Sequence, residues 1–122
     1  MMDINEEILR CRKWIEDALE YSGGTHDFDD IVDAIYSGRM QLWPAENSAL
    51  VTEIIVYPRK KVLHIFLGGG ELQEILGMHE DVIEWAKLQG CEALTVAGRA
   101  GWSKPLKEHG WSEPYRTYSL DF

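Results

Sequence analysis

The sequence is short of basic residues, and this shortage argues against nucleic acid as a partner. Twelve Lys and Arg stand against 21 Asp and Glu, so the 122-residue chain carries a formal net charge of −9. Nucleic acid binding needs clustered cations, whereas the basic residues here are scattered apart from Arg59-Lys60-Lys61. Because this trio follows Pro58 in an expected turn, we interpret it as a solvated loop.

Long apolar runs, secretion features and closely spaced cysteines are lacking as well. No stretch of about 18 apolar residues occurs, so we expect neither a membrane span nor a membrane partner. Residues 1–7 contain no basic region and no apolar core of the kind that a secretion signal needs. Cys11 and Cys91 lie far apart on separate predicted elements, which favours a reduced protein of the cytoplasm.

The histidines and cysteines follow no metal-binding pattern. The four histidines are His26, His64, His79 and His109. Their separations match no usual zinc spacing, and neither cysteine has a nearby Cys or His partner. We therefore expect no metal ion.

What the chain does contain is 45% hydrophobic residues, enough for one core, and we expect a single domain over residues 1–122. Apolar residues at three-four spacing predict an amphipathic helix over 3–21. This apolar stripe consists of Ile4, Ile8, Cys11, Ile15 and Ala18. Residues 1–24 thus form an N-terminal helix whose stripe docks either on its own core or, as a peripheral arm, on a partner.

Strands and helices alternate in the rest of the chain. Asp27 caps a second helix, which ends at Gly38. Strands are predicted over 39–43, 49–57, 62–67, 93–97 and, as a last strand or hairpin, 111–122, and helices over 71–89 and 103–109. The apolar run at 62–67 indicates a central strand, and the crossover through the helix makes 93–97 its parallel neighbour. With antiparallel early strands, this is an α/β or α+β chain with a mixed central β-sheet flanked by helices.

Three glycines separate the predicted central strand from the helix at 71–89. Gly68, Gly69 and Gly70 would let an anion approach the backbone, and the N–H groups of Glu71 and Leu72 would meet it at the positive end of the helix. The alternative is a plain left-handed turn between strand and helix. Neither a G-x-G-x-x-G fingerprint nor a P-loop is present, so the glycines alone identify no ligand.

The order of elements and these motifs resemble the GNAT superfamily of N-acyltransferases over residues 26–122. The likeness rests on the strand, glycines and helix at 62–89, on the strand that follows, and on Gly110-Trp111, which is similar to the family's glycine-aromatic ending. A narrower likeness, carried by Gly98-Arg99-x-Gly101-Trp102, is to small GNAT-like proteins encoded by bacteriophages. The resemblance implies that acetyl-CoA binds at Gly68 to Leu72 and that an acyl group passes to a primary amine.

Two features of the family's chemistry are missing from this chain. The family's pyrophosphate loop has the form Arg/Gln-x-x-Gly-x-Gly/Ala, whereas this chain has Leu67-Gly68-Gly69-Gly70-Glu71-Leu72, with no basic or amide residue. Many members also place a Tyr four residues before the ending glycine as a proton donor, and Leu106 occupies that position here. We therefore expect the fold to be kept and catalysis to be weak or lost.

Four residues are candidates for the remaining chemistry. His64, on the central strand, is either a general base or a hydrogen-bonded core histidine. Glu53 is a second base candidate or a solvated surface acid, and Tyr115 is a proton donor or simply a strand-forming residue. Arg99, after the strand 93–97, would contact the cofactor or form a salt bridge.

Two functions remain open from the sequence. The first is a weak or degenerate acetyl-CoA-dependent N-acetyltransferase of phage origin, acting on an unknown amine in the host cytoplasm. The second is a catalytically inactive interaction or virion-assembly protein with the same fold. In the second case the first helix, the acidic surface and exposed aromatic residues would bind other proteins.

Overall fold

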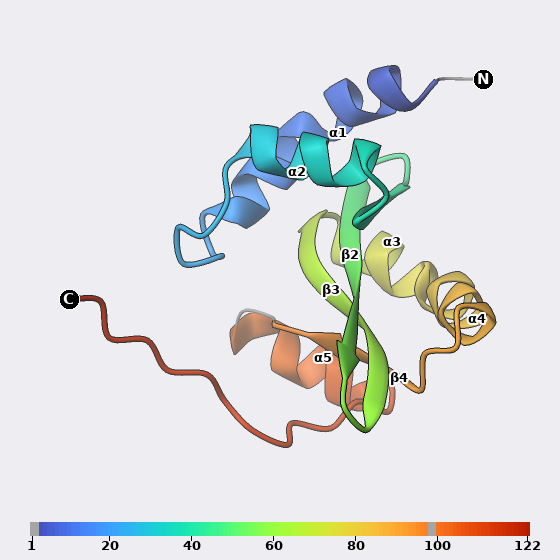
Figure 1. Ribbon diagram of the computed structural model, residues 1–122, viewed down its shortest axis with the longest axis vertical. Coiled ribbons are helices and arrows are strands. Elements are labelled where there is room, and N and C mark those ends of the chain that lie inside the picture. Colours follow the sequence, from blue (N-terminus) through green and yellow to red (C-terminus); the bar gives the residue numbers. More distant parts are fainter. Residues whose placement is uncertain (1–2, 98–99) are drawn as a thin grey trace.

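The computed structural model describes residues 3–97 and 100–122, which form one four-stranded mixed sheet with helices on both faces (Figure 1). In chain order the elements are α1 (Ile4–Leu19), α2 (Phe28–Tyr36), β1 (Met40–Pro44), β2 (Ser48–Tyr57), β3 (Lys60–Gly70), α3 (Leu72–Gly77), α4 (His79–Leu88), β4 (Ala93–Val96), the 3-10 helix η1 (Ala100–Trp102) and α5 (Ser103–Glu108). The predicted class, a mixed sheet flanked by helices with an additional N-terminal helix, is confirmed. Within the described part of the chain, no helix is long and apolar enough to cross a membrane.

The first helix, α1, docks on the chain's own sheet. Its first turn is capped by Asp3, whose carboxylate accepts a hydrogen bond from the amide of Glu6 at 2.9 Å. The predicted stripe is buried from Ile8 to Ala18, and only its first member, Ile4, is exposed. The buried part packs against β2 and β3 in one cluster with α2. The apolar stripe of α1 is therefore part of the core.

The second helix, α2, begins at a reciprocal capping box that can be tested by mutation. The Asp27 carboxylate accepts from the amide of Asp30, and the Asp30 carboxylate accepts from the amide of Asp27, each at 2.9 Å. Asp27→Ala should lower the free energy of unfolding by about 1 kcal/mol in urea titrations. Asp29→Ala, an acid in the same turn outside the box, is the control. An equal loss in both variants would show that the box is not the source.

The sheet has the order β1-β2-β3-β4. The first two pairings are antiparallel and the last is parallel, with Val62 to Ile65 of β3 opposite Ala93 to Val96 of β4. On one face, Val82 and Ala86 of α4 join a buried cluster with residues of β3. The prediction of a central third strand, a parallel neighbour and a covering helix is therefore confirmed.

A β-bulge in β3 turns the end of this strand. Val51 of β2 pairs with Leu67, but the next residue along β2 pairs with Ile65, so Phe66 is an extra residue in β3. As a result, Ile65 packs toward α3 and α4, whereas Phe66 and Leu67 both pack toward α1 and α2. The bulge thus redirects the part of β3 that carries the glycines.

The single helix predicted over 71–89 is wrong. The segment forms two helices, since α3 ends at Gly77 and α4 begins at His79, with Met78 between them. Gly77 is the physical reason, because glycine is among the poorest helix formers and gains no side-chain contact here. His79, on the predicted apolar face, is half-buried and lies against the ring of Trp111.

The last strand or hairpin predicted over 111–122 is also wrong. Trp111 is half-buried beside α4, but residues 112–122 are irregular and exposed. Tyr and Thr give this segment a high strand propensity, yet propensity alone does not hold a strand without a neighbour to pair with.

Candidate functional site

The three glycines form the end of β3, so the predicted glycine turn is wrong. Gly68, Gly69 and Gly70 pair with Leu50, Ala49 and Ser48 of β2. β3 continues through the glycines because β2 offers them backbone pairing partners back to Ser48, the first residue of β2. Gly70, with a φ of +101°, then turns the chain into Glu71, whose amide donates to the carbonyl oxygen of Asn47 at 3.1 Å. The Glu71 amide, which we expected to face an anion, is used inside the fold.

Close packing accounts for the absence of side chains at this strand end. A Cβ atom on Gly68 would lie 2.5 Å from the ring of Trp102, and one on Gly69 would lie 2.3 Å from the carbonyl oxygen of Trp14. A Cβ on Gly70 would lie 2.2 Å from a backbone oxygen of the turn before β2. Since Trp14 belongs to α1, this helix lies directly on the backbone of β3.

A cavity of about 360 Å³ lies beside the glycines. Its lining residues are Lys13, Trp14, Asp17, Gly68, Gly69, Gly70, Leu72, Ile75 and Trp102. Leu72 and the glycines were predicted as ligand-binding residues, and the structure brings them together here. The sequence interpretation missed Lys13, because α1 delivers this cation from a distant part of the chain. A cavity of this size with one cation, one carboxylate and apolar walls can hold a small molecule.

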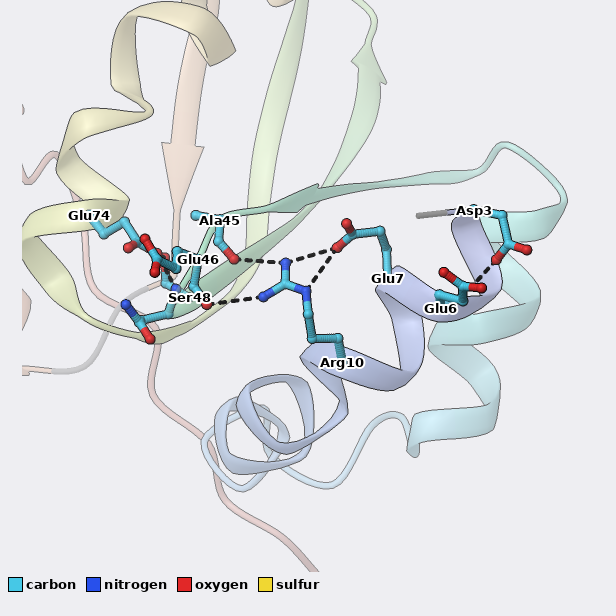
Figure 2. A network of polar contacts seen from close by, with 9 residues as sticks. Asp3, Glu6, Glu7, Arg10, Ala45, Glu46, Ser48 and Glu74 are labelled. Atoms are coloured by element: carbon cyan, nitrogen blue, oxygen red, sulfur yellow. Dashed lines mark hydrogen bonds and ion pairs between the residues drawn. The ribbon is translucent and has the colours of Figure 1, made fainter. Parts of the chain in front are cut away.

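The turn at residues 45–48, which packs on Gly70 at the end of β3, is bound to α1 through Arg10 (Figure 2). Arg10 donates hydrogen bonds to the carbonyl oxygens of Ala45 at 2.8 Å and Glu46 at 3.0 Å, and to the carboxylate of Glu7 at 2.8 Å. The hydrogen bond with Glu7 is the main reason that the pKa of Arg10 is raised. Arg10 therefore joins α1 to the turn that packs on Gly70.

Glu74 of α3 holds the same turn from the other side (Figure 2). Its carboxylate accepts a hydrogen bond from the amide of Asn47 at 2.8 Å and another from the buried hydroxyl of Ser48. This pairing satisfies a hydroxyl that would otherwise be costly to bury. The cavity walls from α1 and α3 are thus connected through one short turn.

A second polar group lies on the face of the sheet that α1 and α2 partly cover. Glu53 lies opposite His64 across β2 and β3, and His64 lies opposite Thr95 across β3 and β4. His64 Nδ1 is 2.8 Å from Thr95 Oγ1. Burial lowers the pKa of His64, and the charge of Glu53 partly opposes this shift. When Nδ1–H donates to Thr95, Nε2 carries the free lone pair and can accept a proton.

Of the other predicted site residues, none that the structure describes joins Glu53, His64 and Thr95. Tyr115 lies in the irregular C-terminal segment with 73% of its surface exposed. Arg99 lies outside the described residues. Leu106, at the position of the family's proton donor, is half-buried in α5. Thr95 was not singled out from the sequence, because only the parallel register places it beside His64.

Comparison with known proteins finds similarity at the level of the fold. No family model and no curated protein matches the sequence. A point mutant of TTHA1254 from Thermus thermophilus is 12% identical, with 98% of this chain and 93% of that chain covered and a TM-score of 0.68.

Two further solved structures are similar to this chain. A point mutant of BH1408 from Bacillus halodurans is 14% identical, with 96% of this chain and 92% of that chain covered and a TM-score of 0.62. An acetyltransferase from Trypanosoma brucei is 14% identical, with 90% of this chain and 94% of that chain covered and a TM-score of 0.59. What this chain shares with these structures is a mixed α+β fold, compatible with a GNAT-like fold.

Proposed function

We propose that this protein is a weak GNAT-like N-acyltransferase that binds an acyl-CoA and transfers its acyl group to a primary amine. The point at which the two parallel strands stop pairing carries the proposal. β4 ends at Val96, opposite Ile65, while β3 continues through its bulge to Gly70. The last residues of β3 border the cavity under α1, where a backbone edge can bind a thioester carbonyl. The likeness in fold to the Trypanosoma brucei acetyltransferase supports the same class of chemistry.

Lys13 is the proposed substitute for the cation that the glycine segment lacks. Its ammonium group lies at the cavity and would pair with a phosphate of CoA. Leu72, Ile75 and Trp102 give the cavity an apolar wall, which suits the uncharged arm that carries the thioester. Asp17 lies at the same cavity and repels phosphate, so the affinity is expected to be low.

His64 is the proposed general base. Its Nε2 takes a proton from the attacking amine, whose nitrogen bonds to the thioester carbonyl carbon. The carbon–sulfur bond then breaks, and CoA leaves as a thiolate. Glu53 stabilises the imidazolium that forms. Leu106 has no proton to donate, so the thiolate must be protonated by solvent and turnover is slow.

Thermal stability with and without ligand tests the proposed cofactor. Millimolar acetyl-CoA should raise the Tm of the protein by about 3 °C, because a ligand that binds the folded state stabilises it. Lys13→Ala should weaken the apparent affinity about tenfold. Lys87→Ala, an equal change of charge on exposed α4, is the matched control and should leave affinity unchanged. Absence of any shift for the unmodified protein would contradict the acyltransferase proposal.

A non-catalytic interaction protein is the second candidate, and the packing on the glycines favours it. The ring of Trp102 and the backbone of α1 occupy the space in front of Gly68 and Gly69, where a bound phosphate would need open backbone. The protein would then have kept the fold and bind other proteins, virion proteins among them. No acetyl-CoA shift together with no transfer to a panel of primary amines would favour this candidate.

A further inference from the structure

The segment after Trp111 leaves the folded body as an exposed arm, which we define as residues 112–122. Trp111 itself is held, because its amide donates to the carbonyl oxygen of Leu106 at 3.0 Å and its ring lies against His79. Among the described residues, no backbone hydrogen bond joins the arm to another element. Figure 1 shows the arm running outward, with the C-terminal end away from the sheet.

The arm carries large apolar side chains in strand-like alternation. Tyr118, Leu120 and Phe122 are separated by the polar residues Ser119 and Asp121, so an extended arm presents the three apolar side chains on one face. All three of these side chains are exposed, Tyr118 to 86% and Leu120 to 84%. Such a face is costly to leave in water and has the pattern of a half-buried strand.

The sheet offers a matching open edge at β4. This strand is the last in the sheet order and packs against β3 and α4. Among the described elements, none pairs with its outer edge. An edge strand presents unpaired N–H and C=O groups in a row, which is a template for another strand. The paired part of β4 is four residues long, close to the length of the alternating part of the arm.

We propose that the arm of one copy adds a strand to the β4 edge of a second copy. Residues 118–122 then pair with Ala93 to Val96 of the other chain, and their apolar face covers the side of the sheet next to α4. A two-fold axis makes the exchange reciprocal, so both arms and both β4 edges are paired and the assembly closes at two copies. The inference is independent of acyl transfer, since neither the cavity nor His64 takes part.

A second copy fits better than the chain's own β4 because contacts at the base of the arm hold it beside α5. The carboxylate of Glu113 is held by Lys107 of α5 at 3.4 Å and by Arg116 at 2.6 Å. Together with the anchored Trp111, these contacts fix the first residues of the arm beside α5. From there the arm runs outward, and its end lies away from the sheet of its own chain (Figure 1).

Analytical ultracentrifugation of the full chain at physiological salt tests the exchange. We expect a concentration-dependent dimer. The double variant Tyr118→Lys/Leu120→Lys should raise the dimer dissociation constant about tenfold or more, because it removes the apolar face. The double variant Thr117→Lys/Ser119→Lys adds the same charge to the opposite face and should change this constant far less. Because the arm is exposed, neither variant disturbs the fold. A strictly monomeric protein would overturn the proposal.

Amide hydrogen exchange separates pairing between copies from pairing within one chain. If the arm docks on a second copy, residues 93–96 and 118–122 become protected together as protein concentration rises through the dimer range. Protection of both segments at every concentration in a monomer would mean that the arm pairs with its own β4, and would overturn the proposal. A dimer in which these segments stay unprotected would also overturn it, because the contact would lie elsewhere.

Discussion

Gly70→Ala is expected to lower the free energy of unfolding by roughly 3 kcal/mol. Two costs add at this position. Gly70 has a φ of +101°, which side chains with a Cβ atom rarely adopt. The new Cβ would also lie 2.2 Å from the carbonyl oxygen of Asn47 and 2.5 Å from the Cα of Ser48. Because both neighbours are backbone atoms held by Arg10 and Glu74, they cannot yield cheaply.

The measurement is thermal or urea denaturation, with Gly77→Ala as the matched control. A Cβ on Gly77 would meet no atom within 4 Å, and this residue ends α3. The control should therefore be neutral or stabilising by up to about 1 kcal/mol. If Gly70→Ala were as stable as the unmodified protein, the close contact between the end of β3 and the 45–48 turn would be wrong. The same cost makes Gly70 a poor position for testing ligand binding, since any substitution also destabilises the fold.

His64→Gln is expected to reduce kcat/KM for acyl transfer by about 10²–10⁴, because glutamine can hydrogen-bond to Thr95 but cannot accept the proton. Binding of acetyl-CoA should be kept, since His64 is not among the residues that line the cavity. His79→Gln, which changes a histidine on the opposite side of the sheet beside Trp111, should leave the rate unchanged. Equal rates for His64→Gln and the unmodified protein would make His64 a structural histidine.

The same variant should reveal a pH dependence of stability. Burial lowers the pKa of His64 in the folded chain below its unfolded value of about 6.5. Between these two values the unfolded chain binds more protons, so the free energy of unfolding falls as the pH drops below about 6.5. It levels off once the pH is below the folded pKa. Relative to His64→Gln, the unmodified protein should therefore lose stability on acidification, and parallel stability curves would contradict a buried, neutral His64.

The elements that the sequence predicts best are those with a clear apolar period. The stripe of α1 and the apolar run of β3 each mark a side of the chain that has to be covered, and most of their apolar residues are buried in the structure. Gly68 to Gly70 have no side chains and hence no period, so a turn and a strand end were equally consistent with them. The contacts that decide between these two come from Trp14 and Trp102, far away in sequence.

The site residues are brought together by the pairing of strands and by the docking of α1, and neither can be read from a short stretch of sequence. His64 and Glu53 could be identified from the sequence as ionisable residues on strands. That they lie opposite each other depends on how β2 and β3 are aligned, and the bulge at Phe66 shifts this alignment by one residue. Thr95 enters through the parallel pairing with β4, and Lys13 through the docking of α1. The predicted strand at 111–122 failed for the converse reason, since its residues favour a strand but pair with no strand of the same chain among the described residues.

The packing of α1 on β3 sets an order of events during synthesis. Trp14 of α1 leaves the ribosome well before the backbone on which it rests, at Gly69, is translated. At about 5–20 residues per second, the apolar stripe of the nascent helix stays without its sheet for a time on the order of seconds. During that interval Ile8, Cys11 and Ile15 have no sheet to cover them, so α1 is made before β3 but reaches its place only after β3 has been made.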